Sequence, residues 1–231
     1  MLYETDPNKC KRKSMGIVLK RRDNAPIVKD VYGGIIDILM KDKNINKAVE
    51  FLQSCLQNII EEKYPLDKLI ITKSLRGNYK NPQQIAHKVL ADRMGKREPG
   101  NKPSTGDRIP YVYIETKNKN CLQGDKIEHP DFIIKNKIRP NYSFYITNQI
   151  MKPVQQVFAL VLDNIDSFKR KKKNFNMKIE TLKNTIDEPD KLQAKIDDLR
   201  NKEVKTLLFD KYLRETENMK NNMKSIKSFF M

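Results

Sequence analysis

Apolar residues recur with the spacing of an α-helix in two successive stretches near the start of the chain. The stretches are Ile27–Met40 and Ile45–Lys63, and each keeps its apolar side chains on one face. We predict two amphipathic helices that form a hairpin. Gly33 and Gly34 lie inside the first helix without any phosphate-loop motif around them, so they favour close helix packing.

Short β-forming runs and further helices follow. Strands are predicted at 16–20, in "LDKLIITKSL" and in "IPYVYIE". A helix is predicted over "NPQQIAHKVLADRMGKRE", with Asn81 as N-cap and Pro82 at the first helical position. "HPDFIIKNKIRP" is predicted to be irregular, and helix resumes over "YSFYITNQIMKPVQQVFALVL", where Pro153 marks a kink or a boundary. The fold class predicted is mainly α with short β strands (α+β).

The composition changes near Ile165. A basic run, "FKRKKKNFNMK", is followed by a polar segment with one thin apolar stripe between Leu192 and Leu213. The stripe is too short and irregular for a coiled coil, so we predict that this segment docks on its own domain. After Glu217 the chain is predicted to be a tail.

Charge is the strongest bulk signal. The 231 residues hold 46 Lys and Arg against 29 Asp and Glu, a formal charge of +17, which indicates a polyanionic partner such as nucleic acid. A Lys-rich surface from a compositionally biased genome is the alternative. The three Cys and two His have no metal-ligand spacing, so neither a zinc site nor a disulfide framework is predicted. Apolar runs are too short to span a bilayer and the start is no signal peptide, so we expect an intracellular protein without a membrane partner.

No catalytic group of side chains stands out. We find no defensible carboxylate pair, and Asp23, which follows two arginines, is predicted to be their ion-pair partner instead of a metal ligand. Cations next to turn residues are candidates for phosphate contacts, a solvated surface being the alternative. The candidate DNA-binding residues are Lys13, Arg21, Arg22, Asp23, Lys73, Tyr79, Arg93, Lys96, Arg97 and Arg108.

Several motifs occur in an order that resembles a known family. "KSMGIVLKRRDNAP", "LIITKSL", "NYKNPQQIAHKVLADRM", "GDRIPYVYI" and "YITNQIMKPV" are similar to the thumb and carboxy-terminal region of family B DNA polymerases, especially delta-like enzymes and those of large double-stranded DNA viruses. The resemblance covers about residues 1–162. It implies a helical thumb that grips primer–template DNA behind the active site.

The resemblance also assigns roles to individual residues. It implies that Arg21 and Arg22 lie at the duplex with Asp23 orienting an arginine, and that Lys73 and Tyr79 are thumb contacts or supports. Asp107 and Arg108 would shape the late thumb, and residues Tyr145 to Gln149 would begin the helix that packs back toward the palm. The family pattern has Lys directly before the first glycine, whereas Met15 stands there in this chain and Lys13 lies two positions further back.

Other family features do not occur in this sequence. The palm motifs Ser-Leu-Tyr-Pro-Ser and Asp-Thr-Asp, the fingers and the exonuclease acids are missing, so no cofactor is expected on this chain. Mg²⁺ is expected in the palm of the full polymerase, and the palm and fingers portion becomes an expected partner. We interpret the chain as the carboxy-terminal part of a viral-type enzyme. The alternative is a stand-alone, non-enzymatic DNA- or clamp-binding protein derived from a polymerase.

The last residues resemble a peptide that binds a PCNA-type sliding clamp. Such peptides follow Gln-x-x-aliphatic-x-x-aromatic-aromatic, and this chain has Met223, Ile226, Phe229 and Phe230 at those positions. A terminus that folds back on the thumb is the alternative. Replication implies localisation in the host nucleus or a cytoplasmic viral factory.

The expected organisation has four parts. They are a palm-to-thumb connection with a basic DNA-facing loop at 1–26, the thumb at 27–164, a basic helical extension at 165–216, and a flexible tail with the clamp-binding peptide at 217–231.

Overall fold

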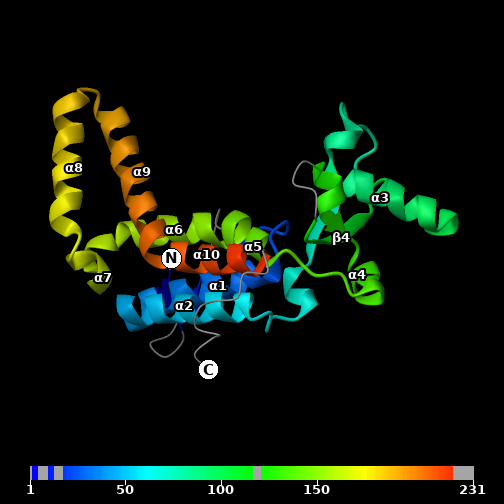
Figure 1. Ribbon diagram of the computed structural model, residues 1–231, viewed down its shortest axis with the longest axis horizontal. Helices are drawn as coiled ribbons and strands as arrows, with labels where there is room; N and C mark the ends of the chain where they lie inside the picture. Colours follow the sequence, from blue (N-terminus) through cyan, green and yellow to red (C-terminus); the bar gives the residue numbers. More distant parts are fainter. Residues whose placement is uncertain (1, 5–9, 13–17, 117–120, 221–231) are drawn as a thin grey trace. The chain divides into compact units, whose positions relative to one another are not determined.

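The computed structural model describes residues 2–4, 10–12, 18–116 and 121–220. This part of the chain is mainly helical with short strands, which confirms the predicted fold class. The chain divides into two compact units, each made of two separate stretches (Figure 1). Unit 1 comprises residues 1–30 and 64–141, and unit 2 comprises residues 31–63 and 142–231. The 165–216 extension packs with the early helices of unit 2.

Unit 1 is built around a small antiparallel sheet with the strand order β3-β4-β5. In the register, Lys73 pairs with Ile109 and Val112 pairs with Glu128. A separate antiparallel pair joins β1 and β2. The elements of this unit are β1 (Leu2–Glu4), β2 (Cys10–Arg12), β3 (Ile71–Ser74), α3 (Ala86–Arg97), β4 (Arg108–Tyr113), β5 (Ile127–Glu128) and α4 (Pro130–Asn136).

The two faces of this sheet have different neighbours. Side chains alternate between the faces along a strand, and directly paired residues share a face. Lys73 therefore shares one face with the buried Ile109 and Tyr111, while the buried Val112 and Glu128 share the other. Helix α3 contacts β4 and β5, and it lies on the Val112–Glu128 face. The sheet thus separates two sets of charged groups within unit 1.

Two predicted elements of unit 1 are corrected by the structure. Residues Val18–Lys20 form a 3₁₀ turn and no strand, and the rest of the predicted strand lies outside the described residues. Residues Pro82–Gln84 also form a separate 3₁₀ turn, so Asn81 and Pro82 do not begin α3. The physical reason is that Ile85 is extended, with φ −95° and ψ 102°, which interrupts the helix before Ala86.

The segment predicted to be irregular forms α4. His129 accepts a hydrogen bond from the backbone N–H of Asp131 through Nδ1, at 3.3 Å, and Pro130 occupies the first turn. The helix ends where Lys137 takes a left-handed conformation with φ 51°. Its seven residues are too few for a periodic apolar pattern, which explains why the sequence pattern missed it.

Unit 2 contains the predicted helical hairpin. It comprises most of α1 (Pro26–Asp37), a short π-helical turn, and α2 (Ile45–Ile60). The predicted apolar face of α2 is buried, as expected. A Cβ atom on Gly34 would overlap the ring of Phe51, which confirms that this glycine permits close helix packing.

The helix predicted around Pro153 is continuous. It consists of α5 (Tyr142–Phe144), a π-helical turn at Tyr145–Ile150, and α6 (Met151–Leu160). Proline cannot donate to the carbonyl of the preceding turn, and a π turn is one way in which a helix accommodates such a break. Tyr145 in this turn is fully buried.

The basic extension folds as four helices, which are α7 (Asp166–Lys169), α8 (Lys172–Thr185), α9 (Pro189–Leu208) and α10 (Asp210–Lys220). Helix α9 packs on α6 and buries Val204 and Leu208, while α10 contacts α2. The predicted docking on its own domain is confirmed. The predicted tail begins too early, because α10 continues to Lys220.

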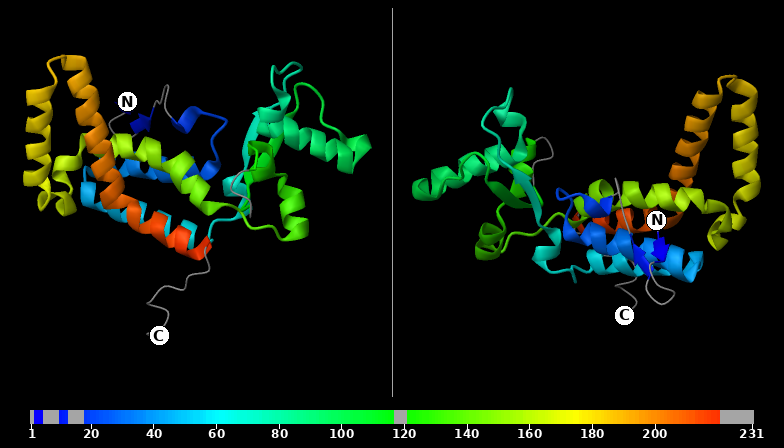
Figure 2. Two further views of the ribbon diagram at one scale, coloured as in Figure 1. Left: turned by 45° about the horizontal axis from the view of Figure 1, so that its top comes forward. Right: turned by 180° about the vertical axis from the view of Figure 1, so that it is seen from behind.

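Helices α8 and α9 form a hairpin whose far end stands apart from the other helices of unit 2 (Figure 2). No helix in the described part of the chain is long and apolar enough to cross a membrane.

Candidate nucleic-acid interface

A carboxylate between two cations connects the loop before α1 to strand β3. Asp23 accepts hydrogen bonds from Nε and Nη2 of Arg21, both at 3.2 Å, and from Nζ of Lys73 at 2.8 Å. We call these three residues the Asp23 cluster. The predicted ion pair between Asp23 and an arginine is present, and Lys73 joins it from fifty residues further along the chain.

The electrostatics of the Asp23 cluster favour a charged carboxylate. The hydrogen bond from Arg21, followed by that from Lys73, holds the pKa of Asp23 well below its usual range. Arg22, next in the chain, is exposed. The Asp23 cluster together with Arg22 has three positive charges and one negative charge, so this part of the surface keeps a net positive charge. The carboxylate orients two of these cations and leaves them accessible to an anion.

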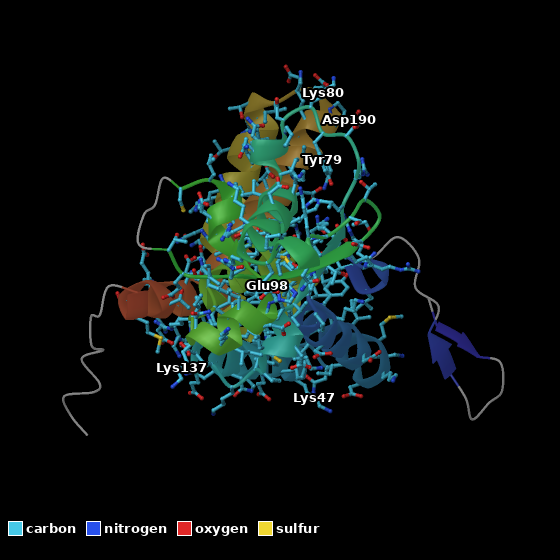
Figure 3. The ribbon with its side chains drawn as sticks, turned by 90° about the vertical axis from the view of Figure 1, so that its right-hand side faces the viewer. Lys47, Tyr79, Lys80, Glu98, Lys137 and Asp190 are labelled. Atoms are coloured by element: carbon cyan, nitrogen blue, oxygen red, sulfur yellow. The ribbon has the colours of Figure 1, made fainter. Side chains whose placement is uncertain are left out.

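Tyr79 and His87 form a second polar contact in unit 1. The Tyr79 hydroxyl accepts a hydrogen bond from the backbone N–H of Arg76 at 2.7 Å and lies 3.1 Å from Nε2 of His87. Burial lowers the pKa of His87, and the charges of Lys73 and Arg76 lower it further, so the imidazole is neutral near pH 7. Through its contacts with Arg76 and His87, Tyr79 supports its own loop. Lys80 follows it in this loop at an exposed position (Figure 3).

A buried carboxylate organises the other face of the sheet. Oε2 of Glu128 lies 3.1 Å from Nη1 of Arg93 and 2.9 Å from Nη2 of Arg97, and its Oε1 accepts the backbone N–H of His129 at 2.9 Å. We call Arg93, Arg97 and Glu128 the Glu128 cluster. Arg93 also donates to the carbonyl of Gly124. A buried charge needs such partners, and here they tie α3 to β5.

Arg97 has a further contact that fixes its guanidinium group. The group lies 3.6 Å from the centre of the Phe132 ring, a cation–π geometry. The predicted DNA contacts at Arg93 and Arg97 stay predictions, and the structure gives both side chains an intramolecular function.

Lys96 lies at the edge of a hollow beside α3. The hollow has a volume of about 440 Å³ and includes Gln83, Arg93, Lys96 and Lys102 in its wall. Because Gly95 lacks a side chain, the aliphatic part of Lys102 packs closely against α3 at that position. Lys96 itself is exposed.

Arg108 stands at the start of β4 and donates to Oγ1 of Thr72 at 2.7 Å. Arg108 and Lys73 belong to neighbouring strands, yet the register places them on opposite faces of the sheet. The candidate residues of unit 1 therefore do not form a single surface. Asp107, which the resemblance placed beside Arg108, accepts the backbone N–H of Ser104 at 2.7 Å and shapes the turn before β4.

Two residues with clear roles were missed by the sequence analysis. Glu128 had a weak signal, namely an acid directly after an apolar strand residue. Thr72 had no signal, because its role comes from strand pairing with β4. Five candidate residues lie outside the described residues, and these are Lys13, Met223, Ile226, Phe229 and Phe230. Within the described ranges, no group of three or more His, Cys, Asp or Glu side chains is arranged to hold a metal ion.

Comparison with known proteins identifies relatives over most of the chain. The family described as "DNA polymerase family B" matches residues 1–161. A DNA polymerase of Pyramimonas orientalis virus is 51% identical over 234 residues, which cover 99% of this chain and 19% of that protein. A DNA polymerase of Acanthamoeba polyphaga mimivirus is 52% identical over 171 residues, which cover 72% of this chain and 10% of that protein.

More distant relatives include the DNA polymerase delta catalytic subunit of Candida albicans. It is 32% identical over 163 residues, which cover 70% of this chain and 15% of that protein. The solved structure of the family B DNA polymerase from Pyrobaculum calidifontis matches with 21% identity and a TM-score of 0.47, over 57% of this chain and 17% of that chain.

The two viral relatives described above are more similar to this chain than the Candida albicans delta subunit is. The chain spans less than a fifth of the length of the three relatives described above. On the match that covers residues 1–161, the chain belongs to DNA polymerase family B.

Proposed function

We propose that this chain is the thumb portion of a template-directed DNA polymerase and grips the primer–template duplex during replication. One observation carries the proposal, which is the Asp23 cluster with the exposed Arg22 beside it. This set lies in the segment that matches the polymerase family. Arg21 and Lys73 are held by hydrogen bonds to Asp23 before any ligand arrives, which reduces the entropy lost on binding.

The proposed grip is directed at phosphates and not at bases. Arginine and lysine side chains presented from a loop and a strand edge suit phosphate oxygens, which are the same for every sequence. The proposal therefore predicts binding that depends steeply on salt and weakly on sequence.

The nucleotide-transfer chemistry is assigned to other parts of the polymerase. The donor sets of the described residues do not fit a Mg²⁺ site, so no catalytic step is placed on this chain. Palm and fingers portions are the proposed partners, and the chain contributes duplex binding to their activity.

The test is the double substitution Arg21→Ala/Arg22→Ala. Binding to primer–template duplexes of several sequences is measured between about 50 and 200 mM salt. The slope of log K against log salt should fall by about two, roughly 0.9 for each lost phosphate contact, and by the same amount for every sequence. The charge-matched control is Lys191→Ala/Lys195→Ala on α9. A loss confined to particular sequences, or an equal loss in the control, contradicts the proposed grip.

We also propose that the carboxy-terminal peptide tethers the polymerase to a PCNA-type sliding clamp. The support is the spacing of Ile226, Phe229 and Phe230, which in a short helical turn would bring the aliphatic and aromatic side chains to one side. A tether of this kind raises the effective concentration of the enzyme at the primer end.

The tether is tested with Phe229→Ala/Phe230→Ala and a purified PCNA-type clamp. Aromatic anchors in a pocket dominate such interfaces, so the clamp affinity should fall by about 2 kcal/mol or more. Lys224→Ala/Lys227→Ala changes the intervening positions and serves as the control. Equal affinity for the clamp in the aromatic variant and the unchanged protein contradicts the tether.

A further inference from the structure

Five consecutive cations lie at the foot of the α8–α9 hairpin in unit 2. They are residues Lys169–Lys173, which close α7 and open α8, and we call them the basic segment. The segment lies beyond the part of the chain that matches the polymerase family, which ends at residue 161. It also belongs to a different unit from the Asp23 cluster.

The backbone of the basic segment is held in place from both sides. Phe168 before it and Phe175 after it are buried, and their rings pack edge to face with centroids 5.2 Å apart. Between them, the N–H of Lys171 donates to the carbonyl of Phe168 at 2.8 Å, and the N–H of Phe175 donates to the carbonyl of Lys171 at 3.0 Å. The cations therefore occupy a preformed helical turn, and ordering them on a ligand costs little entropy.

Acidic neighbours hold three of the five cations. Lys169 pairs with Asp166 at 2.6 Å, Lys171 with Glu203 at 3.2 Å, and Lys172 with Asp163 at 3.2 Å. These acids have other partners as well, since Asp163 also pairs with Arg200 and Asp166 accepts a hydrogen bond from Asn46. Lys169, Lys171 and Lys172 thus stabilise the turn between α7 and α8, where the α8–α9 hairpin begins.

The two remaining cations are differently placed. Arg170 and Lys173 are exposed, and among the described residues neither side chain has an ion pair or hydrogen bond. They are three positions apart in a helical turn, so they lie on the same side. A guanidinium and an ammonium group side by side on a fixed turn match an anion with repeated phosphate oxygens.

We propose that the basic segment is a second nucleic-acid binding surface, which contacts the phosphodiester backbone through Arg170 and Lys173. It goes beyond the proposed grip by the Asp23 cluster, because it lies in unit 2 and in the extension outside the family match. Because the contacts are to phosphates, this surface would add affinity for a duplex without any reading of its bases.

A nuclear-import receptor is the competing occupant, because runs of lysine and arginine also serve as import signals. The structure favours nucleic acid. Unwinding the turn into an extended peptide would expose Phe168 and Phe175, whereas a phosphate backbone can contact Arg170 and Lys173 with the turn intact.

The test is Arg170→Gln/Lys173→Gln in the full chain, with Lys191→Gln/Lys195→Gln as the control. Both variants remove two positive charges from exposed positions of the same hairpin region. Duplex DNA affinity is measured between about 50 and 200 mM salt, and thermal unfolding checks that both variants fold. The Arg170/Lys173 variant should bind several-fold more weakly, with a salt slope lower by about two, while the control keeps the slope of the unchanged protein.

Three results overturn the proposal. They are an unchanged salt slope in the Arg170/Lys173 variant, an equal change in the control, and loss of nuclear import with DNA affinity unchanged. The same pair of substitutions is repeated in the Arg21→Ala/Arg22→Ala background. A persisting loss there supports a separate surface, whatever the outcome for the Asp23 cluster.

Discussion

The Asp23 cluster and the Glu128 cluster have the same composition, one carboxylate and two cations, on opposite faces of one small sheet. They differ in burial, since the Asp23 side chain is 29% exposed and the Glu128 side chain is 3% exposed. A buried carboxylate must keep its cations, because losing one leaves a charge without solvation. A partly exposed carboxylate can orient its cations and still leave them available to phosphates. Burial, more than residue type, separates the structural Glu128 cluster from the proposed binding cluster at Asp23.

The largest expected effect tests the structural side of this comparison. Glu128→Ala removes the carboxylate that joins α3 to β5 and leaves two guanidinium groups without their partner. The free energy of unfolding should fall by about 3 kcal/mol, measured by urea denaturation. Glu50→Ala, on the exposed face of α2, should change it by less than about 0.5 kcal/mol. Equal stability of the two variants would show that the Glu128 cluster is dispensable.

The next effect separates the two clusters directly. Arg97→Ala should lower stability by about 1–2 kcal/mol, because Arg93 still neutralises part of the Glu128 charge, and should leave the salt slope of DNA binding unchanged. Lys73→Ala should lower the salt slope by about one and stability by less than about 1 kcal/mol. A reduced slope in both variants would place Arg97 on the DNA as well, and the comparison would then fail.

The Asp23 cluster should also show a characteristic pH dependence. The pKa of Asp23 is lowered in the folded protein, so its contribution to stability is present above the unfolded pKa of about 3.9 and is lost as the pH falls through the lower folded value. Asp23→Asn should therefore cost about 1 kcal/mol at neutral pH, with a smaller difference in acid. Unfolding of both proteins is compared from neutral pH to below about pH 4. A difference that grows in acid would contradict the sign.

The smallest expected effect concerns Arg108. Thr72→Val keeps the shape of the side chain and removes the oxygen that accepts from Arg108 at 2.7 Å. Because this contact is exposed, stability should change by about 0.5 kcal/mol, measured by thermal unfolding. A change in stability as large as that of Glu128→Ala would show that the exposed contact between Arg108 and Thr72 stabilises the fold as strongly as the buried Glu128 cluster.

The sequence predicted the features that depend on neighbours in the chain. The helices α1 and α2 repeat their apolar residues over several turns, and the ion pair between Arg21 and Asp23 joins residues two positions apart. The order of the polymerase motifs is likewise a property of the chain itself, and the match over residues 1–161 confirms the family that the motifs indicated. Elements shorter than about two turns, such as α4, were missed because such a length cannot show a period.

The tertiary structure alone decided which charged residues are available. Nothing in the sequence distinguishes Lys73 from Arg97. Lys73 pairs with the partly exposed carboxylate of Asp23, whereas Arg97 pairs with the buried carboxylate of Glu128. The pairing of Glu128 with α3 spans more than thirty residues and arises only when β5 joins the sheet. The sequence determines which residues carry a charge. The tertiary structure determines how far each charge is buried, and burial sets the desolvation energy that the partners of the charge must offset.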